Sequence, residues 1–124
     1  RVIERPVTIL GGSDAGAHCG IFQDAQSPTH LLTHWVRDRA RGARLPIELV
    51  VSKQTKEVAR LFHLGDRGEL APGKKADINV IDLEGLRMQR PYIVNDLPTG
   101  AMRWLQQVSG YRHTFVSGKE TFAD

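Results

Sequence analysis

The sequence predicts an α/β fold in which one strand and two amphipathic helices precede a β-rich C-terminal half. Residues 7–10 form a short apolar run closed by Gly11-Gly12, which is typical of a buried strand leading into a tight loop. Helical periodicity follows over residues 28–64, and short β-type runs separated by Gly and Pro fill the second half. This order is neither a complete barrel nor a complete sandwich, and no initiator Met precedes Arg1. We therefore expect a piece of a larger chain.

Two helices are expected in the first half. The first should span residues 28–41, because Ser27 is a favoured N-cap, Pro28 is a favoured first helical residue and Gly42 follows the last turn. Its apolar face is formed by Leu31, Leu32, Trp35 and Val36. The second should begin at Pro46 and end before Gly65, with an apolar stripe of Ile47, Val50, Val51, Val58, Leu61 and Phe62.

Strands are expected in the second half. Residues 78–81 form a β-rich run, and residues 111–116 alternate before Gly118 and a second run at 121–122, which predicts a C-terminal hairpin. Residues 90–100 have no clear period and are expected to be extended loop with one short strand at most. The chain therefore divides into residues 1–65, with the first strand and helices, and residues 66–124, the β-rich segment.

Composition limits the function classes. The chain has 124 residues, 40% hydrophobic and 25% charged, which fits one globular domain. No apolar run approaches the roughly 20 residues of a membrane helix, and a single cysteine, Cys19, excludes an internal disulfide. A cytoplasmic protein without membrane association is the expectation. The net charge of +3 permits nucleic-acid binding without requiring it, and no nucleic-acid partner is expected.

The strongest candidate site is the loop at residues 11–18, directly after the predicted strand. An Asp among small residues at the carboxyl end of a strand is where α/β folds place catalytic groups, and Asp14 could bind a metal or take a proton from water. Ser13 and His18 are the candidate substrate-binding residues. The alternative is that Ser13 and Asp14 only cap a turn.

Other candidates carry weaker signals. His30 and His34 lie one helical turn apart as in zinc-binding helices, but no Glu follows His30 and no third ligand is evident. We expect one of them to be packed and the other to line a pocket beside Trp35. Cys19 is expected to be a small buried filler. Four arginines between the helices form either a solvated helix end or a phosphate-binding patch: Arg37, Arg39, Arg41 and Arg44.

The chain resembles the C-terminal part of metal-dependent amidohydrolases of the N-acyl-D-amino-acid deacylase (D-aminoacylase) branch. Three motifs in the family's order carry the resemblance: GGSDAGAH at 11–18, PTHLLTHWVRDR at 28–39 and DRGELAPGKKADINVID at 66–82. The resemblance implies that residues 1–65 end a TIM-type barrel and that 66–124 supply strands of a small β-domain. Asp14 would match the aspartate after the last barrel strand, which binds the metal or its water and acts as general base and acid.

The resemblance also implies function and partners. The parent protein is expected to use a divalent metal, with zinc as the expected ion, to hydrolyse amide C–N bonds of N-acyl-D-amino acids or a related small amide. The family's other metal ligands would precede Arg1, so this piece alone should be inactive and should bind no metal tightly. We expect a homo-oligomer or association with the missing N-terminal part. The alternatives are a cyclic amide or ureide substrate, as in dihydroorotase or hydantoinase, and a non-catalytic binding or assembly module that uses the arginine patch.

Overall fold

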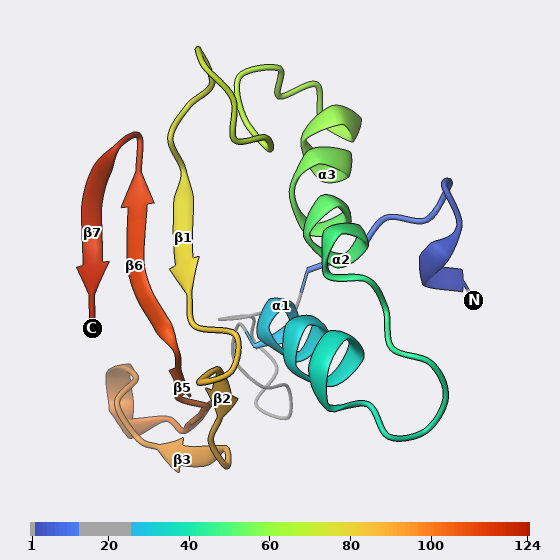
Figure 1. Cartoon of the computed structure of the whole chain (residues 1–124). Helices are drawn as coiled ribbons and strands as arrows, with labels where there is room; N and C mark the ends of the chain where they lie inside the picture. Colours follow the sequence, from blue (N-terminus) through green and yellow to red (C-terminus); the bar gives the residue numbers. More distant parts are fainter. Residues whose placement is uncertain (1, 13–25) are drawn as a thin grey trace.

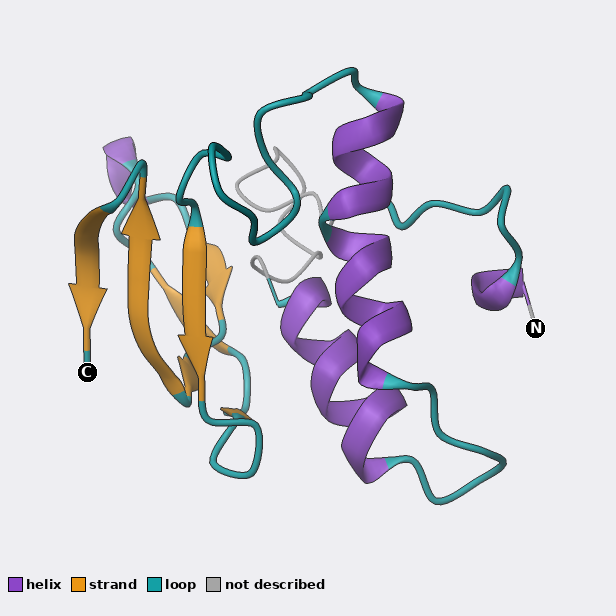
Figure 2. Ribbon diagram, turned by 45° about the horizontal axis from the view of Figure 1, so that its top comes forward, coloured by secondary structure: helices purple, strands orange, loops and turns teal. Residues whose placement is uncertain are grey.

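The structure, a computed structural model, describes residues 2–12 and 26–124, and arranges them as a helical layer beside a set of small antiparallel sheets (Figure 1). A short 3-10 turn, η1 (Val2–Glu4), lies at the N-terminal end. The helices lie on one side and the strands β1, β6 and β7 on the other, as Figure 2 shows from a second angle. Within the described residues, no helix is both long and apolar enough to cross a membrane.

The two predicted helices are both present, with altered bounds. The first consists of α1 (Ser27–His30), continued without a break by the π-helical segment η2 (Leu31–Asp38), so it ends three residues before the predicted Arg41. The second is divided into α2 (Ile47–Gln54) and α3 (Lys56–Leu61). Thr55 causes the division: its φ and ψ of −125° and −80° leave the helical region, and its hydroxyl binds the Val51 carbonyl at 2.8 Å.

The main sheet has three antiparallel strands in the order β1 (Ile78–Ile81), β6 (Tyr111–Val116), β7 (Lys119–Ala123). The predicted strand at 78–81 and the C-terminal hairpin are therefore confirmed. Two smaller ladders pair β2 (Arg87–Met88) with β5 (Val108–Ser109) and β3 (Tyr92–Val94) with β4 (Arg103–Leu105). A 3-10 turn, η3 (Pro98–Gly100), connects β3 to β4.

The strand predicted at residues 7–10 is not formed, and this prediction is wrong for the described structure. The segment turns and then runs extended beside the helices, with the Thr8 amide bonded to the Arg5 carbonyl at 3.1 Å. Val7 is 90% exposed. A strand requires a neighbouring strand to pair with, and none of the described strands lies in a ladder with this segment.

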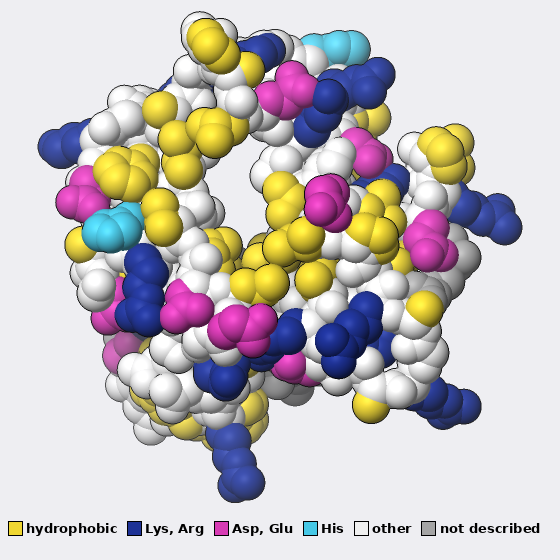
Figure 3. All heavy atoms as spheres, viewed as in Figure 1, with side chains coloured by type: hydrophobic (Ala, Val, Ile, Leu, Met, Phe, Trp, Pro, Cys, Tyr) yellow, Lys and Arg dark blue, Asp and Glu magenta, His cyan; other side chains and the backbone are white. Residues whose placement is uncertain are grey.

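The core is small and lies where the two layers meet. Four apolar side chains form its buried centre, from η2, the following loop, α2 and the turn after β1: Leu32, Leu45, Val50 and Leu86. A hydrogen bond of 2.8 Å between the Thr29 and Tyr111 hydroxyls joins α1 to β6. Away from this contact the layers separate, and Figure 3 shows the surface hollowed between them, with hydrophobic side chains around the opening.

The exposed area is large for a chain of this mass. The accessible surface is 8789 Å², whereas a compact monomer of 13.8 kDa is expected to expose about 6600 Å². The chain therefore exposes more surface than a compact monomer of the same mass.

Candidate functional site

The predicted site residues Ser13, Asp14 and His18 lie outside the described residues, as does Cys19. Their assignment to catalysis, metal binding and substrate binding therefore stays a prediction. What the structure does describe is the segment leading to them, residues 2–12, together with the helices against which it lies.

Lys53 holds this lead-in segment against α2. Its side chain is 1% exposed, and its ammonium donates to the Arg5 carbonyl at 2.9 Å, the Thr8 carbonyl at 2.6 Å and the Glu57 carboxylate at 2.7 Å. An ammonium group has three donors, so each has an acceptor. A buried cation is tolerated only with such complete pairing. Lys53 thus ties two backbone positions of the lead-in to the helix that packs on the core.

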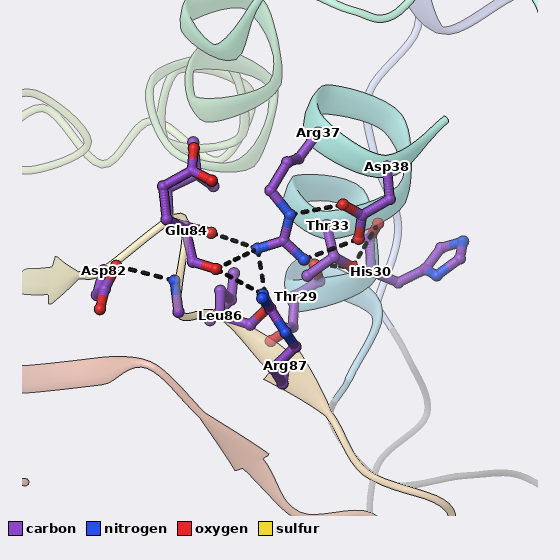
Figure 4. A network of polar contacts seen from close by, with 11 residues as sticks. Thr29, His30, Thr33, Arg37, Asp38, Asp82, Glu84, Leu86 and Arg87 are labelled. Carbon is purple, nitrogen blue, oxygen red and sulfur yellow. Dashed lines mark hydrogen bonds and ion pairs between the residues drawn. The ribbon is translucent and has the colours of Figure 1, made fainter. Parts of the chain in front are cut away.

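Arg37 joins the end of η2 to the turn after β1 (Figure 4). Its guanidinium donates to the carbonyls of Leu83 and Leu86, the latter at 2.9 Å, and makes a longer contact of 3.4 Å with the Glu84 carbonyl. It also forms a two-pronged ion pair with Asp38 at 2.6 and 2.7 Å, and this pairing lowers the pKa of the Asp38 carboxyl. Arg37 is therefore a structural clamp between the two layers.

The arginine cluster is not one free patch. Besides the Arg37 clamp, Arg39 stacks its guanidinium over Trp35 at 4.2 Å and donates from Nε to the Arg41 carbonyl at 2.6 Å. Arg41 and Arg44 are exposed. Two of the four cations are thus committed to internal contacts, which disfavours the binding-module alternative.

His30 and His34 stack on one exposed helix face, with ring centroids 5.1 Å apart and planes 5° from parallel. Desolvation first, and the neighbouring His34 second, lower the pKa of His30. The His34 ring meets Trp35 edge-on at 5.3 Å. Trp35 lines a cavity of about 530 Å³ together with residues of the lead-in segment, Thr8 and Leu10 among them. Neither histidine lines this cavity and both are exposed, so the expectation of one packed and one pocket-lining histidine is wrong, although His34 does contact the tryptophan of the cavity.

The larger hollow lies between the layers and has a volume of about 670 Å³. Its lining combines apolar side chains such as Leu32, Val51 and Ile81 with charged groups at its edge. Four of the five charged side chains in this lining are internally paired: Lys56 contacts Glu69 at 2.5 Å, and Lys75 lies 3.8 Å from Asp77. The arrangement suits the burial of another apolar segment better than the binding of a charged small molecule.

Metal donors do not gather in the described part of the chain. No group of three or more His, Cys, Asp or Glu side chains lies close enough there to hold an ion. His30 of α1 and His34 of η2 supply two donors at most, and a hydrolytic metal needs three or more protein ligands. The described residues therefore do not fit a catalytic metal by themselves.

Sequence reasoning missed the roles of Lys53 and Arg37. The available signal for Lys53 was its spacing: it follows Val50 by three residues and precedes Glu57 by four, which places it on the buried helix face with its ion-pair partner one turn later. Arg37 carried no comparable signal, because its acceptors are backbone carbonyls 46 and 49 residues away.

Comparison with known proteins agrees with the motifs at 11–18, 28–39 and 66–82. The chain matches the amidohydrolase family over residues 1–122. It belongs to the amidohydrolase family. It is also 34% identical over 94 residues to N-acyl-D-glutamate deacylase from Alcaligenes xylosoxydans xylosoxydans, covering 76% of this chain and 17% of that protein. This amidohydrolase chain is thus similar to the D-aminoacylase branch and spans about a sixth of its relative's length. No solved structure matches it.

Proposed function

We propose that this amidohydrolase chain is the C-terminal portion of a hydrolase that cleaves the amide C–N bond of N-acyl-D-amino acids. The family match across residues 1–122 carries the proposal, and the similarity to a protein named N-acyl-D-glutamate deacylase supports the substrate class. In this proposal residues 1–65 complete a TIM-type barrel and residues 66–124 contribute to a small β-domain.

The chemistry is assigned to the loop at residues 11–18. Asp14 accepts a proton from the attacking water and delivers it to the leaving nitrogen, while Ser13 and His18 contact the substrate. Amidohydrolases are generally metal-dependent, and a bound divalent metal, zinc in this proposal, would supply activation of the water. Since the described residues hold no donor cluster, its other ligands would come from outside this part of the chain.

Replacement of Asp14 in the full-length enzyme tests the proposal. Asp14→Asn keeps the shape of the side chain but cannot accept the proton, so kcat should fall about 10²- to 10⁴-fold with little change in KM. Asp66→Asn, the same chemical change at an exposed position, is the matched control and should leave kcat unchanged. Activity of Asp14→Asn within tenfold of wild type would show that Asp14 only caps a turn.

The substrate class requires its own assay. N-acyl-D-amino acids, their L enantiomers and cyclic ureides such as hydantoins should be compared at equal concentration. Turnover of the D series alone supports the assignment, whereas turnover restricted to cyclic ureides would replace it with the ring-opening alternative.

Association is the second part of the proposal. The excess of exposed surface and the apolar hollow between the layers support a homo-oligomer, or the binding of a preceding part of the protein to this one. Light scattering on the purified chain should give a mass at least twice 13.8 kDa. A monomer that unfolds cooperatively at high concentration would show that the chain closes its own core.

A further inference from the structure

A cationic pocket lies at the C-terminal end of α3, where the chain enters the loop over residues 65–75. Its volume is about 350 Å³, at the small end of the range of about 300–1,000 Å³ for ligand pockets. Figure 3 shows basic side chains gathered around this end of α3. In the described part of the chain, the charged and titratable side chains of its lining are Lys56, Arg60, His63, Arg67, Lys74 and Glu69. Positive charge is therefore in excess.

Two of the pocket cations are neutralised by carboxylates. Lys56 contacts the Glu69 carboxylate at 2.5 Å. Arg67 forms a two-pronged ion pair with Asp66 at 2.9 and 3.0 Å. Both pairs bring helix or loop charges together within the structure, so neither Lys56 nor Arg67 explains the excess of positive charge.

The other two cations, Arg60 and Lys74, form no ion pair with any described carboxylate. The Lys74 ammonium donates to the Gly65 carbonyl, which is neutral, and its two remaining donors are left over. The Arg60 guanidinium has no hydrogen-bond partner in the described part of the chain. Lys56 lowers the pKa of the Glu69 carboxyl most, and Lys74 and Arg60 add to this effect through their charge alone. Two positive charges thus face the pocket without compensation.

Capping of the helix does not account for these two cations. Basic side chains near a helix C-terminus commonly bind its last carbonyls. Here backbone amides already bind them, from Phe62 to Val58 at 3.1 Å, from His63 to Arg60 at 3.2 Å and from Leu64 to Ala59 at 2.8 Å. The side chains of Arg60 and Lys74 therefore remain available to another acceptor.

His63 has a left-handed backbone conformation at the same pocket. Its φ is +57°, in a region that costs a residue with a side chain about 1–2 kcal/mol and is usually occupied by glycine at a helix end. Its side chain nevertheless lines the pocket. A strained residue kept at a cavity points to a use for its side chain. An imidazole has an N–H donor in both its neutral and its protonated form.

The two walls of the pocket are held together. The Lys75 amide binds the Asp66 carbonyl at 2.6 Å and closes the loop, while the ion pair of Lys56 and Glu69 joins the loop to α3. Arg60 belongs to the helix wall and Lys74 to the loop wall. Since the Arg60 side chain is exposed, a ligand can reach this preformed site from solvent.

We propose that this pocket binds a phosphate-type oxyanion, either free phosphate or the phosphate group of a small ester, held by Arg60, His63 and Lys74. A phosphate group carries a charge of about −1.5 to −2 at pH 7, which matches two uncompensated cations. Charged donors form the stronger hydrogen bonds to such oxygens. The site has no part in amide cleavage, and the proposal does not depend on the function assigned to Asp14.

Sulfate binding to the full-length enzyme tests the proposal, because sulfate has the same shape and two negative charges. Equilibrium dialysis with labelled sulfate at constant ionic strength measures Kd. Arg60→Met combined with Lys74→Met removes both charges and should raise Kd at least about tenfold. Arg41→Met combined with Arg44→Met removes two charges from exposed positions and should change Kd less than about twofold. Absence of saturable binding below about 10 mM, or equal Kd in the two double variants, would overturn the proposal.

His63→Gly separates ligand binding from folding. Glycine adopts the left-handed conformation without strain, so the urea midpoint should not fall, whereas the Kd for sulfate should rise at least about threefold. This variant keeps the proposal testable if the first double variant unfolds. An unchanged Kd in His63→Gly would overturn the contact between His63 and the anion.

Competition against labelled sulfate identifies the ligand. Displacement by inorganic phosphate or by glycerol 3-phosphate supports the proposal, and the stronger competitor of the two shows whether free phosphate or an ester is preferred. Acetate, a monoanion, should displace sulfate at least about tenfold less well than phosphate. Equal displacement by acetate and phosphate would overturn the assignment to phosphate-type ligands.

Discussion

The Arg37 clamp should contribute a measurable part of the stability, and Arg37→Met isolates it. The substitution keeps an apolar stem of similar length and removes the donors to the Leu83 and Leu86 carbonyls. Hydrogen bonds from charged donors each contribute about 1.5–3 kcal/mol. The half-exposed Asp38 contact adds at most about 1 kcal/mol. Since the turn carbonyls can bind water once released, we expect a net loss of about 2–3 kcal/mol.

Urea unfolding followed by tryptophan fluorescence measures this loss. With a slope of about 1–3 kcal/mol/M, the midpoint should fall by about 1–2 M. Protein concentration must be equal in all samples, because association shifts apparent stability. Arg41→Met removes the same charge from an exposed position and should change stability by no more than about 0.5 kcal/mol. Equal midpoints for Arg37→Met and Arg41→Met would refute the clamp.

Three further predictions concern other parts of the chain. Gly110→Ala should lower the free energy of unfolding by at least about 2 kcal/mol, because Gly110 has φ of +101° and an added Cβ would lie 2.6 Å from the Leu86 Cα. Gly73→Ala is the comparison: Gly73 has φ of +81° but open space around it, so the loss should be about 1–2 kcal/mol. The Gly85 amide and then Arg112 lower the pKa of Asp82. The Asp82 carboxylate therefore stabilises the fold above its usual pKa, and this stabilisation is lost as pH falls through the lowered value. The difference in unfolding free energy between wild type and Asp82→Asn should shrink between pH 5 and 3, and a constant difference would contradict the pairing. After dialysis, elemental analysis of the isolated chain should find far less than one metal ion per molecule, and stoichiometric zinc would show that the chain forms a complete site.

The elements that could be predicted from sequence are those set by local pattern. Residues 78–81 and the C-terminal hairpin are rich in alternating or β-branched residues and have glycine at the turn, so local preference and final pairing agree. Residues 7–10 have an equally apolar composition, but their state depends on a partner strand, which local sequence does not encode. The ladder between β2 and β5 is two residues long and joins positions 87 and 109, so it depends on how parts of the chain far apart in the sequence pack together.

The candidate site follows the same division. The loop at 11–18 could be proposed from its small residues and aspartate, which form a compact sequence pattern, and it stays a prediction. Lys53 could not, because lysine on a helix is ordinarily solvated and its acceptors are main-chain atoms that any residue supplies. The arginine cluster was visible as charge, but only the structure distinguishes the clamp at Arg37 from the exposed Arg41 and Arg44.

The hydrogen bond between Thr29 and Tyr111 has a consequence for the order of folding. Its two residues are 82 positions apart, whereas the His113 and Glu120 contact of the β6–β7 hairpin spans only 7. Closing the longer loop costs about 2 kcal/mol more in chain entropy. The hairpin should therefore form early, and the helices should dock onto the sheet late. During synthesis, α1 leaves the ribosome before β6 has been made, so the face of α1 that carries Thr29 has no sheet to bind until nearly the whole described chain has been synthesised.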